Sequence, residues 1–320
     1  MLTLNNGVAV FDNAYGGLIN VRGEGGRLVT NGDDPLTIGA SISIDIGALW
    51  FNLAADVLLK ANIYSYGPAG SIQMYRDDDS RAMILRKSNA AQVFHLGGTM
   101  VIQDTADVTC ELPIRIDRNG VLLLIEGSDT YATLNVTSQG NATTSNYSVY
   151  MERGYLVVTP QTGIGTTTWD SRKRLKAANK VFVGQQAQVN WRTKDFGTEA
   201  RFDVRGYAVI FPGCLWVNDG TVDLTSGGIL QGWIASRGAS RLVVFTGDLL
   251  LDGTAVLNYG LNVAAPGKGT RYLIAQASTG SISGDFGTKL LPAGVFDTLI
   301  VSNAYYLKAT GTVQPTPAPL

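Results

Sequence analysis

Short strand-like segments fill the chain from end to end, and this pattern restricts the fold more than any other feature. Apolar and polar residues alternate strictly at Ile42–Ile46, Val108–Ile116 and Ala255–Val263, as they do in strands with one buried face. Gly, Asn and Asp interrupt the segments about every ten residues, which is typical of short strands joined by tight turns. The sequence therefore predicts an all-β protein.

Helical patterns are short. The two candidates are Leu53–Ala61 and Arg172–Asn179, and the second follows Asp170 and Ser171, which can cap a helix. Neither is long enough to cover a sheet as a crossover layer. The choice therefore lies among a sandwich, a barrel and a solenoid.

Three features favour the solenoid. The chain is long for a single sandwich, whereas a solenoid grows by adding coils. The segment Val121–Ile125 is apolar at every position directly after Asn119-Gly120, where a hairpin strand would alternate. Strand-turn units also repeat loosely along the chain. We expect coils of roughly 20 to 25 residues that each rise about 4.8 Å, the spacing of neighbouring strands.

Sequence patterns divide the chain into four parts. Residues 1–40 form an N-terminal capping or docking segment, and residues 41–248 form the solenoid body, with an insertion near 160–200. Residues 249–310 alternate like an antiparallel sheet and form a C-terminal β cap, followed by a Pro-rich tail at 311–320. In that tail Pro315, Pro317 and Pro319 predict an extended docking arm.

The segment Arg241–Thr310 carries a family resemblance. It contains an apolar strand, Gly-Asp before three leucines, Gly-Thr before a Tyr-Leu-Ile strand, a GSISGDF turn and a closing Tyr-Tyr-Leu. This segment resembles the last coils of autotransporter-type β-helix passengers, which implies a right-handed parallel β-helix with a sheet-like C-terminal cap. An autotransporter would also carry an export signal and a membrane domain, and neither is recognisable. The whole chain is similar to the β-helical tail and capsid-surface proteins of bacteriophages, which lysis releases.

Charge restricts the partners. Only 16% of the residues are charged and the net charge is −1, so no overall field directs the protein to nucleic acid or to an anionic membrane. One basic cluster exists, and we expect it to be a solvated loop or short helix; it comprises Arg172, Lys173, Arg174, Lys176 and Lys180. No apolar run reaches the 18 or so residues of a transmembrane helix.

The two cysteines, Cys110 and Cys214, allow one disulfide. Cys110 alternates in phase with Val108, Leu112 and Ile114, so the pattern favours a buried free thiol at that position.

Catalytic and metal-binding patterns are scarce. The single histidine, His95, lies between apolar residues with no nucleophile motif nearby, and we interpret it as a packed side chain. The weak catalytic candidates are Asp77, Asp78 and Asp79, because glycoside hydrolysis needs paired carboxyls. Three consecutive strand residues cannot all face one groove, so a solvated loop is the competing interpretation. The sequence predicts no cofactor and no metal.

Aromatic residues offer a contact surface. We name Trp169, Trp191 and Trp233 as candidates for stacking on a glycan or for contact between subunits. The alternative is that these side chains fill the core and the ends of a rod.

The leading hypothesis is a non-enzymatic structural protein of a bacteriophage virion, either a capsid decoration protein or a tail fibre or spike. We expect it on the virion surface as a homo-oligomer, with a trimer as one possibility, in contact with other virion proteins or with cell-surface glycan. The alternatives are a bacterial surface adhesin or extracellular filament subunit, and a tailspike glycan depolymerase.

Overall fold

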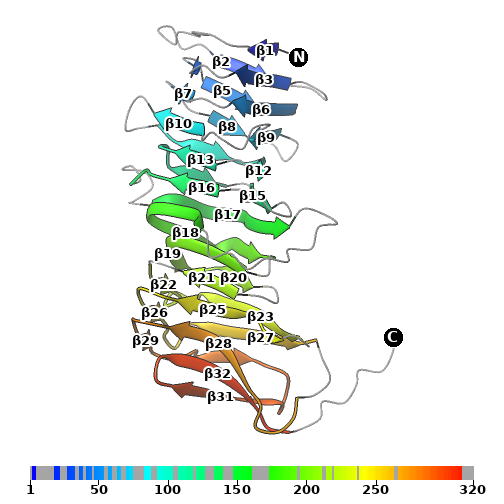
Figure 1. Ribbon diagram of the computed structural model, residues 1–320, viewed down its shortest axis with the longest axis vertical. Helices are drawn as coiled ribbons and strands as arrows, with labels where there is room; N and C mark the ends of the chain where they lie inside the picture. Colours follow the sequence, from blue (N-terminus) through cyan, green and yellow to red (C-terminus); the bar gives the residue numbers. More distant parts are fainter. Residues whose placement is uncertain are drawn as a thin grey trace, which may run out of the picture.

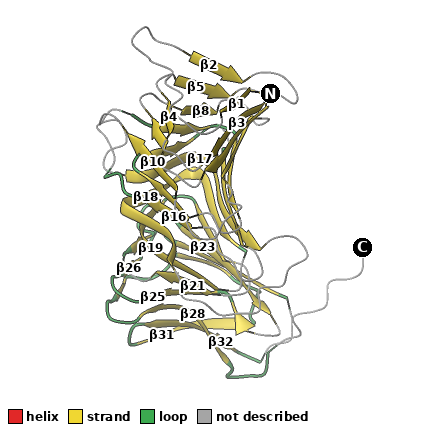
Figure 2. Cartoon of the chain, turned by 45° about the horizontal axis from the view of Figure 1, so that its top comes forward, coloured by secondary structure: helices red, strands yellow, loops and turns green. Residues whose placement is uncertain are grey.

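The fold is described from a computed structural model of the chain. The residues that it describes are 2–4, 18–21, 27–32, 36–38, 41–44, 47–53, 57–59, 63–65, 70–74, 83–87, 92–103, 107–117, 120–126, 133–139, 147–160, 173–192, 195–210, 214–217, 220–235, 238–262 and 266–311. These residues form strands, turns and loops and contain no helix (Figure 2). The chain is therefore all-β, as predicted, and no segment of this described part is a helix that could cross a membrane.

The strands pair in three parallel ladders, and Figure 1 shows the strands stacked along the longest dimension of the molecule. In the simplest stretch, each strand pairs with the strand three places later in the chain. For example, β12 pairs in parallel with β15, β13 with β16, and β11 with β14. Three successive strands thus contribute one rung to each ladder before the chain returns to the first. The whole assembly is a curled sheet dominated by parallel pairing.

The bounds of the strands follow the order of the ladders. The first ladder contains β1 (Leu2–Leu4), β3 (Arg27–Gly32), β6 (Gly47–Leu53), β9 (Gly70–Met74), β12 (Thr99–Gln103), β15 (Val121–Glu126), parts of β17 (Tyr147–Pro160) and β18 (Lys173–Trp191), β20 (Tyr207–Ile210), β23 (Ile229–Ala235), β27 (Val256–Leu261) and β30 (Thr288–Leu290). The second contains β4 (Leu36–Ile38), β7 (Val57–Leu59), β10 (Met83–Lys87), β13 (Asp107–Cys110), β16 (Thr133–Val136), parts of β18 and β19 (Asp195–Val204), β21 (Cys214–Val217), β25 (Arg241–Val244) and β28 (Arg271–Ala277). The third contains β2 (Leu18–Val21), β5 (Ser41–Ile44), β8 (Ile63–Ser65), β11 (Phe94–Leu96), β14 (Ile114–Ile116), parts of β17, β18 and β19, β22 (Val222–Asp223), β26 (Leu249–Leu250) and β29 (Ile282–Ser283).

The core lies between the ladders and is built from columns of apolar side chains. Because the strands are in register, like positions in successive coils lie on top of one another. In the first ladder one inward column runs Met100, Leu122, Leu156, Val189, Ala208, Leu230 and Leu257, and every member is buried. Such columns continue through the stack and remove apolar surface from water at each coil.

Three long strands link the ladders in the middle of the stack. β18 pairs with β16 and β19 in the second ladder, with β17 and β19 in the third, and with β17 and β20 in the first. It turns the corners through irregularities in register, one of which lies between Lys176 and Lys180. An extra stretch of residues at such a point bends a strand without ending its pairing.

The predicted helices are wrong. The segment Leu53–Ala61 contains the end of β6 and the whole of β7, and the described part of Arg172–Asn179 lies in β18. Ala and Lys are strong helix formers, but helix preference is worth less than about 1 kcal/mol per residue, so pairing of β18 with its neighbours outweighs it. The described part of the basic cluster, from Lys173 onward, is correspondingly on a strand, with Lys176 and Lys180 exposed. The described part of the predicted insertion near 160–200 also belongs to the ladders.

The two ends of the stack differ in pairing. At the N-terminal end, β1, β2, β3 and β4 already pair in parallel with strands of the next coil. At the other end β31 (Phe296–Val301) and β32 (Ala304–Ala309) are antiparallel, and β32 also pairs antiparallel with β28. The short strand β24 (Gly238–Ala239) forms an antiparallel turn with β23.

Neither Cys110 nor Cys214 forms a disulfide, and both side chains are buried. The prediction for Cys110 is thus confirmed, and the disulfide that the count allowed is not formed. Burial raises the pKa of the Cys110 thiol to about 12, so it stays protonated and unreactive at neutral pH.

Candidate binding surfaces

The outer face of the third ladder carries a column of polar and aromatic side chains. His95 of β11 lies beside Arg115 of β14, which lies beside Tyr150 of β17. The column continues through Phe182 of β18 to Asp203 of β19. Residues adjacent in this column come from different coils, so the column forms only when the strands are in register.

The centre of the column is a stack of rings between two guanidinium groups. The rings of Tyr150 and Phe182 are stacked, with centroids 4.8 Å apart and planes 12° from parallel. Arg115 lies 5.7 Å from the centroid of Tyr150, and Arg205 lies 5.1 Å from that of Phe182. Tyr147 packs obliquely against both rings. The faces of these rings are thus used within the protein, which favours a stabilising role over stacking on a sugar.

Carboxylates surround the stack and balance its charge. Arg115 forms ion pairs with Glu152 at 3.3 Å and with Asp117 at 3.6 Å. The hydroxyl of Tyr147 donates a hydrogen bond to Asp203 at 2.9 Å, and Asp203 also lies 3.8 Å from Arg205. Burial and the bond to Asp203 raise the pKa of Tyr147 to about 12. The exposed rim of the column therefore presents both signs of charge, suited to contact with a polar surface.

His95 is expected to make folding sensitive to mild acid. Burial lowers the pKa of its imidazole. The negative charge of Asp117 acts in the opposite direction and raises the pKa, whereas the positive charge of Arg115 lowers it further. The unfolded chain then binds the proton more readily, so stability is complete above the ordinary histidine pKa of about 6.5 and falls as pH drops through and below it. Urea unfolding at pH 7.5 and pH 5.5 measures the loss, which His95→Gln should reduce. Because His95 is the single histidine, an equal loss in the variant would contradict this role.

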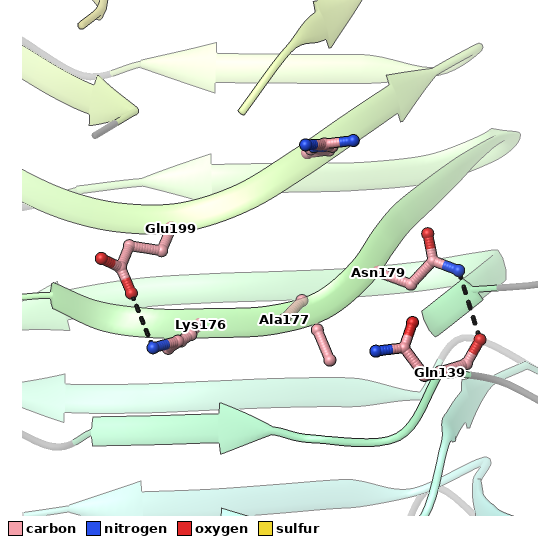
Figure 3. Close-up of a pocket in the computed structure, with 7 residues that line it drawn as sticks. Gln139, Lys176, Ala177, Asn179 and Glu199 are labelled. Carbon is pink, nitrogen blue, oxygen red and sulfur yellow. Dashed lines mark hydrogen bonds and ion pairs between the residues drawn. The ribbon is translucent and has the colours of Figure 1, made fainter. Parts of the chain in front are cut away.

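A second candidate is a polar hollow at a corner of β18 (Figure 3). Its volume is about 450 Å³, and it is lined by Gln139, Lys176, Ala177, Ala178, Asn179, Glu199 and Arg201. The irregularity between Lys176 and Lys180 sets this corner apart from the regular ladder. Lys176 forms an ion pair with Glu199 at 3.1 Å, and the side-chain amide of Asn179 donates a hydrogen bond to the backbone carbonyl of Gln139 at 3.2 Å. These contacts pair the Lys176 ammonium, the Glu199 carboxylate and the Asn179 side-chain amide within the protein.

The structure places the predicted surface tryptophans differently from one another. Trp191 is 2% exposed and packs in the core edge-on against Phe202, with ring centroids 5.7 Å apart. Its proposed role as a glycan or subunit contact is therefore wrong. Trp233 is half-buried on the outer face of β23, where a Cβ on Gly260 would lie 2.9 Å from its indole. Trp169 lies outside the described residues.

The remaining predicted site residues also lie outside the described residues. They are Asp77, Asp78 and Asp79, and Pro315, Pro317 and Pro319. Within the described ranges, no group of three or more His, Cys, Asp or Glu side chains is arranged to hold a metal ion.

Sequence reasoning missed Arg115 and Phe182. These residues can be recognised only from the residues that they face in the next coil, and finding those partners requires the register of the ladder. Comparison with protein-family models and with curated proteins gives no match.

Proposed function

We propose that this chain is a non-enzymatic structural protein of a bacteriophage virion, working as a capsid decoration protein or as a tail fibre or spike. The observation that carries the proposal is the run of parallel pairing that extends from β1 to β30 around one apolar core. We take this arrangement to be a right-handed parallel β-helix, with the antiparallel strands β31 and β32 as its C-terminal cap.

The physical properties of such a rod fit an exposed structural role. Every rung adds hydrogen bonds and a layer of apolar contacts between neighbouring coils, so stability accumulates along the length. The low share of charged residues leaves a surface of neutral polar side chains between the charged columns. A rigid rod of this kind holds its outer faces at fixed positions, as an attachment surface requires.

The proposal includes partners. We expect the chain to form a homo-oligomer and to dock on other virion proteins or on cell-surface glycan. The mixed-charge rim around Arg115 and Asp203 is the surface that we expect to meet a polar partner, and the Pro-rich tail is a candidate docking arm.

Immunogold electron microscopy of the source culture and its lysate tests the virion role. Antibody against this chain should label phage particles, and the position of the label distinguishes head decoration from tail. Label on cell envelopes or on free filaments would contradict the proposal and favour an adhesin. Release of reducing sugar from host capsule by the purified protein would instead favour a glycan depolymerase.

A further inference from the structure

The first ladder has an outer face unlike those of the other two. Between β12 and β27 its outward residues fall into two columns that follow the long axis. One column is Thr99, Val121, Tyr155, Gln188, Tyr207, Ile229 and Val256, and the other is Val101, Leu123, Val157, Asn190, Val209, Gln231 and Asn258. These two columns, called here the apolar strip, contain no charged side chain, and all members except the buried Asn190 and Val209 are at least partly exposed.

The other two ladders provide an internal comparison. Outward positions of the second ladder include Arg86, Asp107, Lys176, Glu199 and Arg241. Those of the third include Arg115, Asp203 and Asp223. All three faces belong to one chain and share the same strand geometry. The lack of charge on the strip is therefore a property of that face and not of the fold.

Strands that are apolar on both sides are typical of parallel sheets with both faces covered. β15 shows this pattern most clearly, because Leu122 and Leu124 point into the core while Val121 and Leu123 point outward. The exposed fraction reaches 41% for Tyr155 and 38% for Tyr207. Nine of the fourteen residues of the strip are Val, Leu, Ile or Tyr, and an exposed patch rich in such side chains marks a contact with another molecule.

We propose that the apolar strip is the surface through which two copies of this chain pack side by side. This inference depends on the homo-oligomeric part of the proposed function but not on the virion role. Another copy supplies a strip of the same length, the same spacing of columns and the same lack of charge. With a net charge of −1 per chain, two copies approach with little overall repulsion.

The size and the borders of the strip are those expected for contact with a second copy of the chain. Strands about 4.8 Å apart make it about 30 Å long, and two columns with their side chains make it about 15 Å wide. Two strips in contact bury on the order of 1,000 Å² in total, the lower limit for a specific interface. Arg153, Arg205 and Arg192 lie along its edges, so an apolar centre is bordered by charge, as in other protein interfaces.

Sedimentation of the full chain over a range of concentrations tests the inference. The wild-type protein should form an oligomer whose mass is an integer multiple of the chain mass. Tyr155→Lys and Tyr207→Lys should each weaken association at least tenfold, because each places a charge inside the contact. The matched control is Phe245→Lys, since Phe245 is 37% exposed but follows β25 of the second ladder. It should leave association unchanged, and circular dichroism should show intact strands in all variants.

The outcomes separate the two claims. A wild-type chain that stays monomeric at every concentration overturns the inference and the homo-oligomeric expectation, while particle labelling still decides the virion role. An oligomer that tolerates both tyrosine changes, or that Phe245→Lys weakens equally, overturns the strip as the interface and leaves the oligomer standing.

Thiol labelling gives an independent measurement on folded protein. The native Cys110 and Cys214 are buried, so a maleimide reports on an introduced thiol. Tyr207→Cys should react quickly in dilute protein and several-fold more slowly in concentrated protein, whereas Phe245→Cys should react at one rate. Equal rates for Tyr207→Cys at concentrations that span the association transition would contradict the proposed contact.

Discussion

Gly247→Ala is expected to lower the free energy of unfolding by about 4 kcal/mol or more. Gly247 follows β25, with a φ of +128° that residues with side chains rarely adopt. A Cβ there would lie 2.0 Å from the carbonyl oxygen of Gly220 in the preceding coil, and a Cβ on Gly280 would approach the Gly247 carbonyl just as closely. Since the obstacle is backbone in each case, the coils would have to separate. Urea unfolding followed by circular dichroism measures the loss.

Gly238 provides a matched control for this substitution. Its φ is also +128°, but a Cβ there would meet nothing within 4 Å. Gly238→Ala should therefore lower the free energy of unfolding only by the cost of holding a residue with a side chain at this positive φ, about 1–3 kcal/mol. If the two variants lose the same amount, backbone crowding between coils does not explain the glycine at position 247.

Trp191→Ala should cost about 3–5 kcal/mol of unfolding free energy, the range for deleting a large buried aromatic side chain. The indole is 2% exposed and meets Phe202 at an interplanar angle of 81°. Neighbouring coils are held in register by parallel pairing, so the cavity can collapse only partly.

Trp233→Ala is the comparison that tests this assignment. Trp233 is half-buried on the outer face, so its removal exposes surface to water and leaves no closed cavity, and less than half of the Trp191 loss is expected. Similar losses from the two changes, measured by urea unfolding, would contradict the placement of Trp191 in the core and Trp233 on the surface.

Much of the fold was predictable because strand patterns are local. The alternation at Val108–Ile116 correctly placed Cys110 and Ile114 on the buried face. The apolar run Val121–Ile125 correctly excluded a simple hairpin strand, and its outward half now belongs to the apolar strip. The helical error at Arg172–Asn179 arose because local helix preference was weighed without the pairing partners of β18, which lie far away in sequence.

The candidate surfaces were harder to predict. Trp191 alternates in phase with Ala187 and Val189, a signal that could have placed it in the core. By contrast, the stack of Arg115, Tyr150 and Phe182 depends on which residues of successive coils face each other. The coils differ in length and β17 and β18 contain irregularities in register, so no fixed period in the sequence identifies these partners.

The unbroken path of β18 through all three ladders has a mechanical consequence. A stack of coils joined by turns can lose its end coils one at a time, since each coil contacts only its neighbours. Detaching β18 requires release of pairing with β16, β17, β19 and β20, so peeling that starts at either end stops at this strand. In hydrogen exchange the amides of β18 should be the last to exchange. Under tension the protein should unfold first at its ends, while the coils around β18 stay folded longest.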